Sequence, residues 1–292
     1  MNEDDVRVAA DTRDILGEGP VWLKEGGVLA WVDIGSSAWH RLNLATGEVA
    51  TSFFDVALTG FAPIEGGDFI GAFTDGIAIF DEQGRKPVLH RPEADKPGNR
   101  FNDAGCDPEG RFIAGTMVMD GDMAEAAFYS LESDGGLSVL RAGVTIANTV
   151  AFSRDGARIY LADTAKGELA AFHYDAATGS LGPRDATFIP PDDLPGSPDG
   201  SAVDAEGYLW NARWDGGCVA RLRPDGCLDR LLSLPVSKPT SCAFVGETLY
   251  ITTSTWGFGK DERQNEPLAG CLLAVDVGVC GVPRASFGGR AE

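Results

Sequence analysis

The chain has 292 residues, and its 44 Asp and Glu against 24 Lys and Arg give a formal net charge of -20 at pH 7. A protein this acidic repels both the phosphate backbone of nucleic acids and anionic membrane surfaces, so we expect neither as a partner. A hydrophobic content of 43% with 23% charged residues excludes a disordered chain and predicts a packed core.

The N-terminal residues Met1 to Asp5 lack the basic region and apolar run of a secretory signal. No stretch approaches the roughly 18 apolar residues of a membrane-spanning helix. We therefore expect a cytoplasmic protein. The six cysteines are scattered without Cys-x-x-Cys spacing, which favours reduced thiols over disulfides.

A glycine followed closely by a short apolar strand recurs along the chain. The intervals between these glycines are 40, 43, 46, 51 and 39 residues, and their positions are Gly27, Gly67, Gly110, Gly156, Gly207 and Gly246. Repeats of about 40 to 50 residues are typical of β-propeller blades with four strands each. No long helical periodicity lies between the repeats.

The first repeat reads as four short strands, at residues 20–23, 28–34, 38–44 and 48–54. The last repeat is one strand short and ends near residues 272–275, and the apolar segment 6–9 can supply the missing strand. We therefore predict an all-β, six-bladed β-propeller with four antiparallel strands per blade. It would form a single domain over residues 1–292, in a ring closed by the N-terminal strand.

Four polar residues share one phase of this repeat. Asn102, Asn148 and Asp199 each lie eight residues before the glycine of their repeat, and Glu18 lies nine before. In a propeller this phase is the start of the innermost strand, so we expect the four side chains to surround one end of the central channel. Such oxygen-rich groups suit a divalent cation. The alternative is that each residue only makes an Asx-type turn.

Two long connections are predicted on the same face as these polar residues. They span residues 117–126 and 255–270, and the second contains Trp256, Phe258 and Gln264. Loops on a rigid scaffold commonly carry recognition, so we expect a lid and substrate pocket here, the alternative being solvated surface insertions.

Several familiar catalytic patterns are missing from the sequence. It contains no Gly-x-Ser-x-Gly elbow and no phosphate-binding Gly-Lys-Ser/Thr loop. The three histidines, His40, His90 and His173, fall at unrelated phases of the repeat, which argues against a three-histidine zinc site.

Five short motifs together resemble the SMP-30/gluconolactonase/luciferin-regenerating-enzyme family over nearly the whole chain. They are Gly-Glu-Gly-Pro-Val-Trp at 17–22, Arg-Phe-Asn-Asp at 100–103, Ile-Ala-Asn at 146–148, Pro-Asp-Gly-Ser at 198–201 and Lys-Pro-Thr-Ser-Cys-Ala-Phe at 238–244. The resemblance implies a six-bladed propeller with lactonase activity on aldonolactones and one catalytic divalent metal ion. It also implies metal ligands at Glu18, Asn148 and Asp199, with Asp199 as the catalytic base and Arg100 and Asn102 holding substrate.

The chain departs from the family pattern at two places. Thr149 stands where the family usually has Gly, and residues 211–217, Asn-Ala-Arg-Trp-Asp-Gly-Gly, replace a Trp-Gly-Gly run. Neither departure removes a ligand, but both are expected to reshape the pocket. We group Asp103 with the substrate-binding residues, where it would orient Asn102 or Arg100, with a turn-forming role as the alternative.

The predicted function is hydrolysis of a neutral sugar lactone to the aldonic acid, with metal-activated water and Asp199 as base. The alternatives are a metal-dependent esterase or organophosphate hydrolase, and a calcium-binding propeller scaffold without catalysis. The sequence does not distinguish Ca, Zn, Mn, Mg and Fe as the metal, and it leaves the sugar, the ring size of the lactone and the oligomeric state open.

Overall fold

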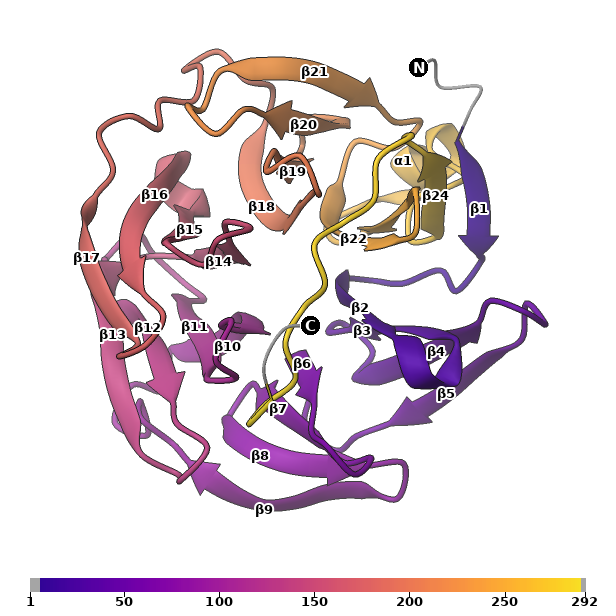
Figure 1. The fold of residues 1–292 in the computed structure, drawn as a ribbon. Helices are drawn as coiled ribbons and strands as arrows, with labels where there is room; N and C mark the ends of the chain where they lie inside the picture. The colour runs from indigo at the N-terminus through magenta and orange to yellow at the C-terminus, as the bar shows by residue number, and fades with distance from the viewer. Residues whose placement is uncertain (1–5, 290–292) are drawn as a thin grey trace. The chain divides into compact units, whose positions relative to one another are not determined.

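The computed structural model describes residues 6–289. The described residues form six sheets of four antiparallel strands each (Figure 1). Five sheets join their strands in sequence order, and the sixth joins the N-terminal strand to the last three strands of the chain. Helix in the described residues is confined to α1 (Lys260–Asn265) and two 3-10 turns, η2 (Lys24–Gly26) and η3 (Thr164–Lys166). These sheets are the blades of a six-bladed β-propeller, as predicted.

The chain divides into two compact units. The first contains the residues up to Ala57 together with Thr187–Val282. Its three sheets are formed by β2 (Gly17–Leu23), β3 (Val28–Asp33), β4 (Ala38–Asn43) and β5 (Val49–Phe53); by β18 (Ser197–Val203), β19 (Leu209–Trp214), β20 (Cys218–Leu222) and β21 (Leu228–Ser233); and by β22 (Pro239–Val245), β23 (Thr248–Thr253), β24 (Leu272–Asp276) and β1 (Arg7–Ala10).

Strand β1 completes the last sheet by pairing antiparallel with β24, with Arg7 opposite Ala274. The predicted closure by the N-terminal strand is therefore confirmed. A three-stranded blade would leave the N–H and C=O groups of β24 unpaired at a sheet edge, and β1 satisfies them.

The second unit contains Leu58–Ala186 and the chain from Pro283 onward. Its sheets are formed by β6 (Leu58–Pro63), β7 (Phe69–Phe73), β8 (Gly76–Asp81) and β9 (Gly84–His90); by β10 (Asn99–Cys106), β11 (Phe112–Val118), β12 (Ala126–Leu131) and β13 (Leu137–Val144); and by β14 (Ala147–Phe152), β15 (Arg158–Asp163), β16 (Glu168–Asp175) and β17 (Ser180–Arg184).

The hydrophobic core of each unit lies between neighbouring sheets. In the first unit, Trp31 and Tyr250 belong to one buried cluster, and Trp210 and Ile251 belong to another. In the second unit, Phe101 packs with Phe112 and Ile70, joining the sheets of β6–β9 and β10–β13. Each fully buried side chain of this size contributes about 1.5–3 kcal/mol, so sheet-on-sheet packing holds each blade in place.

The six glycines that define the repeat all adopt a positive φ, from +59° at Gly246 to +107° at Gly67. They form the tight turns that lead into the second strand of each blade. A residue with a Cβ is strained in this left-handed region, and glycine is not. The repeat spacing seen in the sequence therefore reflects a backbone requirement.

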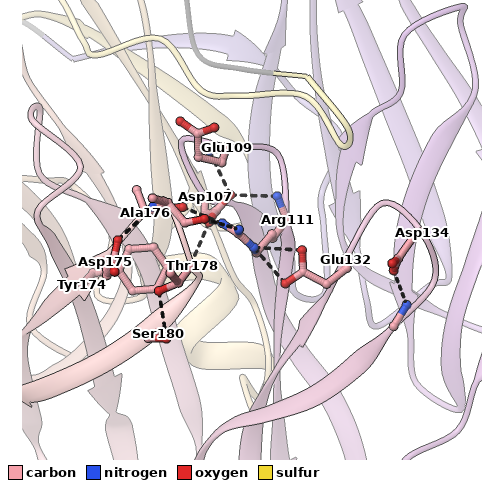
Figure 2. A network of polar contacts seen from close by, with 12 residues as sticks. Asp107, Glu109, Arg111, Glu132, Asp134, Tyr174, Asp175, Ala176, Thr178 and Ser180 are labelled. Atoms are coloured by element: carbon pink, nitrogen blue, oxygen red, sulfur yellow. Dashed lines mark hydrogen bonds and ion pairs between the residues drawn. The ribbon is translucent and has the colours of Figure 1, made fainter.

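A hydrogen-bond network around a buried ion pair joins two blades of the second unit (Figure 2). Asp107 follows β10, is fully buried, and accepts hydrogen bonds from Arg111 Nη1 at 2.8 Å and from Tyr174 Oη at 2.7 Å. Arg111 also donates to the Ala176 carbonyl oxygen at 2.7 Å. Tyr174 and Ala176 belong to the neighbouring blade, so this network fixes the packing of β10–β13 against β14–β17.

All six cysteines are free thiols, and three of them, Cys218, Cys242 and Cys271, are buried. Among the described residues, no helix has the length and apolar character needed to cross a lipid bilayer.

Candidate functional site

The innermost strand of every blade has an irregularity close to its start. At this point the register with the second strand shifts, in a β-bulge or a similar distortion. Thr59, Asn102, Asp199 and Thr240 lie within the shift. Glu18 and Asn148 are the last paired residues before it. Bulges redirect a side chain and are frequent beside active sites. The four polar residues of the shared sequence phase thus all lie at or directly beside such a shift.

In the first unit, β22 lies between β2, which carries Glu18, and β18, which carries Asp199. Thr240 Oγ1 donates to the Gly17 carbonyl oxygen at 2.5 Å. On the other side, Gly200 contacts Ser241 so closely that a Cβ at this glycine would lie 2.5 Å from the serine Cβ. Glu18 and Asp199 are therefore held on either side of the β22 bulge.

Asp199 is 4% exposed, and its backbone is fixed by the neighbouring strand. Asn211 Nδ2 donates to the Asp199 carbonyl oxygen at 2.9 Å and to Ser201 Oγ at 3.0 Å. Arg213 lies opposite Pro198 in the same ladder. Burial lowers the pKa of Arg213, and the negative charge of Asp199 acts in the opposite direction, so the guanidinium and this carboxylate interact electrostatically.

In the second unit, Asn102 and Asn148 are in direct contact although 46 residues separate them. Asn102 Nδ2 donates to Asn148 Oδ1 at 2.9 Å and to the Ala147 carbonyl oxygen at 2.9 Å. Arg100 Nη1 donates to Asn102 Oδ1 at 2.9 Å, and Asn148 Nδ2 donates to Thr164 Oγ1 at 2.8 Å.

This chain of hydrogen bonds has one direction because a guanidinium can only donate. Arg100 therefore fixes which end of the Asn102 amide accepts, and Asn102 in turn fixes the Asn148 amide. Asn148 Oδ1 accepts from Asn102, and an amide oxygen has two lone pairs. Arg100 and Asn102, which the sequence assigned to substrate binding, thus orient the Asn148 amide, whose oxygen is the predicted metal ligand.

Asp103 lies in the bulge of β10, but it contacts β14. Its carboxylate accepts the N–H of Ala104 at 2.8 Å and the N–H of Val150 at 3.3 Å. Burial raises the pKa of Asp103 above its ordinary value, and the charge of Arg284 offsets part of this rise. Asp103 therefore anchors the bulge next to Asn148, and its role in orienting Asn102 or Arg100 stays a prediction.

Thr149 follows Asn148 and has a φ of +60°. Gly19, the residue that follows Glu18 in the first unit, has a φ of +52°. A β-branched residue in this region is an outlier, and such strain is often found at functional sites. The departure from the family pattern noted in the sequence thus falls where the bulge requires a left-handed residue, and Thr149 is fully buried there.

The segment between β23 and β24, predicted as a long loop, contains the short helix α1. Lys238 Nζ donates to the Trp256 carbonyl oxygen at 2.8 Å and lies 4.9 Å from the Trp214 ring centroid and 5.1 Å from that of Phe258. Trp256 is 54% exposed. Lys238 therefore ties this segment to the edge of the β19–β20 turn, and its role as a lid stays a prediction.

The predicted metal ligands fall into two groups. Glu18 and Asp199 belong to the first unit and Asn148 to the second. Within residues 6–289, no group of three or more His, Cys, Asp and Glu side chains is arranged to hold a metal ion. The predicted set is of another kind, with two carboxylates and one carboxamide. These are oxygen donors, and they fit a hard divalent cation with few protein ligands.

Comparison with known proteins places the chain in a family. Residues 16–255 match the sequence profile described as the SMP-30/Gluconolactonase/LRE-like region. The chain belongs to the SMP-30/gluconolactonase/LRE-like family. The resemblance read from the five motifs is thereby confirmed.

Two lactonases are among the relatives of this family member. It is 35% identical to pentonolactonase XacC of Haloferax volcanii, over 94% of each chain. It is 36% identical to 6-deoxy-6-sulfogluconolactonase of Pseudomonas putida, over 94% of this chain and 96% of the relative. Lactonases are hydrolases of ester bonds, so these relatives agree with the predicted enzyme class. Regucalcin of Danio rerio is also similar, at 32% identity over 99% of this chain and 100% of the relative.

Solved structures support the fold. A calcium-binding protein, regucalcin, from Agrobacterium tumefaciens superposes with a TM-score of 0.90 at 29% identity, covering 96% of each chain. A luciferin-regenerating enzyme superposes with a TM-score of 0.86 at 26% identity, covering 94% of this chain and 97% of the other.

Proposed function

We propose that this chain hydrolyses the ring ester of a neutral sugar lactone to the aldonic acid, with one divalent metal ion held by Glu18, Asn148 and Asp199. The observation that carries the proposal is that these three oxygen donors lie at or directly beside the register shift of the first strand in three different blades. The chain's lactonase relatives match it over almost its whole length, which supports the same conclusion.

A lactone carbonyl is attacked by water, and the reaction needs a proton acceptor and a means of stabilising charge on the carbonyl oxygen. A bound divalent ion supplies Lewis acidity for that oxygen and for the water. Asp199 would accept the proton of the attacking water as a new C–O bond forms at the carbonyl carbon. The ring C–O bond then breaks, and the proton passes to the departing hydroxyl oxygen.

Arg100 and Asn102 would hold the sugar. The Arg100 guanidinium is half-buried and has five N–H donors in a planar fork, which suits several ring hydroxyls at once. The orientation it imposes on Asn102 also reaches Asn148. Substrate binding and metal binding would therefore be coupled through one hydrogen-bonded chain.

The test compares Asp199→Asn with Asp193→Asn, which makes the same change of charge on an exposed residue of the preceding loop. Hydrolysis of glucono-, xylono-, arabino- and galactonolactone is followed by pH-stat, with chelation and with single metals added back. We expect Asp199→Asn to lose about 10²–10⁴-fold in kcat and the control to keep full activity. Metal-free protein that hydrolyses the lactones as fast as loaded protein would contradict the mechanism.

The similarity to regucalcins, one of them described as a calcium-binding protein, favours a second candidate, a calcium-binding propeller without catalysis. Calorimetry with Ca²⁺ on the same samples separates the two candidates. Tight Ca²⁺ binding with no turnover of any lactone would support the second. Turnover that disappears on chelation would support the first.

A further inference from the structure

Arg213 is a buried cation beside the candidate site, and its acceptors are uncharged. The side chain is 5% exposed. Nε donates to the Pro195 carbonyl oxygen at 2.8 Å, Nη2 to the Gly196 carbonyl oxygen at 2.7 Å, and Nη1 to Asn211 Oδ1 at 3.1 Å. Arginine is rarely buried in this way, because removing its charge from water costs several kcal/mol.

The three acceptors lie on the two segments that meet at Asp199. Pro195 and Gly196 lead directly into β18, three to four residues before Asp199. Asn211 lies on β19 and donates to the carbonyl oxygen of Asp199 itself. The guanidinium thus donates hydrogen bonds both to the segment before β18 and to β19, on either side of the bulge that interrupts the β18–β19 ladder.

The backbone around this fork leaves no room for adjustment. Gly196 has a φ of +61°, and a Cβ at that position would collide with the Trp214 carbonyl oxygen. A Cβ at Gly216 would lie 2.7 Å from the Pro195 carbonyl oxygen and 2.8 Å from Arg213 Cβ. The loop before β18 and the turn after β19 therefore pack directly on each other, with Arg213 between them.

A lysine would keep the charge at this position but lose the geometry. Its ammonium is a point donor, whereas three separate acceptors on two segments require the rigid fork of arginine. The chain therefore carries a costly buried cation whose hydrogen bonds all support the backbone around Asp199.

We propose that Arg213 is a positioning residue that fixes Asp199 in the orientation required to bind a divalent cation and to act on the lactone. This inference rests on the proposed function. Residues that hold a metal ligand in place typically change metal affinity or activity by about 10–100-fold when they are replaced. Arg213 acts through Asn211 and the 195–196 backbone, and it does not itself contact substrate.

The test uses Arg213→Lys in the full-length protein, with Arg230→Lys as the matched control. Arg230 is a partly buried arginine of the same blade that donates to the Val277 carbonyl oxygen at 3.2 Å, on the outer strand β21. The measurements are the Kd for Ca²⁺ and Mn²⁺ by calorimetry, kcat and KM with the lactone panel, and unfolding in urea. We expect Arg213→Lys to weaken metal binding and lower kcat by about 10–100-fold each, with KM within about twofold. The control should match wild type.

A second variant, Asn211→Ala, guards against poor folding of the first. If Arg213 acts through Asn211, the double variant should lose less than the product of the two single losses, because the two residues share one connection. A folded Arg213→Lys protein with wild-type Kd and kcat would overturn the proposal, as would fully multiplicative losses. If wild type binds metal but hydrolyses no lactone, the proposed function fails and the Kd values still decide on Arg213. If wild type neither binds nor hydrolyses, both proposals fall.

Discussion

Replacement of Arg111 by methionine tests how much the buried Asp107–Arg111 ion pair and the network around it contribute to stability (Figure 2). Arg111 Nε donates to both carboxylate oxygens of Glu132, at 2.8 and 2.9 Å, and its Nη1 donates to Asp107. Burial lowers the pKa of Arg111, but Asp107 and Glu132 outweigh that effect and the pKa is raised. The arginine is therefore charged at every accessible pH.

The expected loss in free energy of unfolding depends on the hydrogen bonds that Asp107 retains in the variant. Breaking a buried ion pair by removing one partner costs about 3–5 kcal/mol, because a buried charge loses its compensation. Asp107 would still accept the N–H groups of Glu109 and Arg111 and the hydroxyl of Tyr174, which reduces the cost. The Glu132 side chain is 43% exposed, so its pair adds at most about 1 kcal/mol. We expect a loss of about 2–4 kcal/mol.

The measurement is urea unfolding followed by far-ultraviolet circular dichroism at low salt and at high salt. Because the Asp107 pair is buried, the loss should persist in high salt, where surface pairs are screened. Arg7→Met is the control, since it removes a pair with Asp276 in which both side chains are largely exposed, and it should cost under about 1 kcal/mol. A loss below about 1 kcal/mol for Arg111→Met, or one that vanishes in salt, would refute the reasoning.

Three further predictions concern the backbone and the thiols. Gly19→Ala should cost about 1–2 kcal/mol in urea unfolding, because φ is +52° there, whereas Gly98→Ala, where a Cβ meets nothing within 4 Å, should be nearly neutral. Thr149→Gly should lower the free energy of unfolding by about 1–2 kcal/mol less than Thr59→Gly does. Both threonines are buried, but only Thr149 has a strained backbone with a positive φ. Equal losses for the two variants would argue against strain at Thr149. At pH 8 a thiol reagent should label the exposed Cys227 and Cys280 in the native protein and Cys271 only on unfolding. Burial and a hydrogen bond to Asp11 raise the pKa of Cys271 to about 12. The contribution of this thiol to stability is therefore full below about pH 8.5 and is lost as the pH rises toward 12. Labelling of Cys271 in the native protein at pH 8 would contradict its burial.

The fold could be predicted because it depends on spacing and on local pattern. Each repeat needs a left-handed residue at one turn, and glycine at that place marks every blade. The role of the N-terminal strand could be predicted because the last repeat has only three strands, and a three-stranded blade leaves a sheet edge unpaired. Helix α1 could not be predicted, because its residues, Lys260 to Asn265, are all polar or charged and show no apolar periodicity.

The site was predictable only in part. The phase of the repeat located Glu18, Asn102, Asn148 and Asp199, since phase is a property of the sequence. It did not reveal that Asn102 and Asn148 bond to each other, because this depends on the contact between β10 and β14. Arg213 was noted only as part of a departure from the family pattern, and arginine is ordinarily an exposed residue.

Sequence phase by itself does not separate functional from structural residues. Asp107 and Asp204 also share a phase, three residues before Gly110 and Gly207. Asp204 accepts the N–H groups of Glu206 and Tyr208 and a charged bond from Arg221, much as Asp107 accepts those of its own turn. These acids tie down a turn and a neighbouring strand, which is a structural role. Asn102 and Asn148 differ because they lie at or beside a register shift and are oriented by other polar side chains. An acid that accepts the N–H groups of its own turn, as Asp107 and Asp204 do, therefore has a structural role that its phase in the repeat does not reveal.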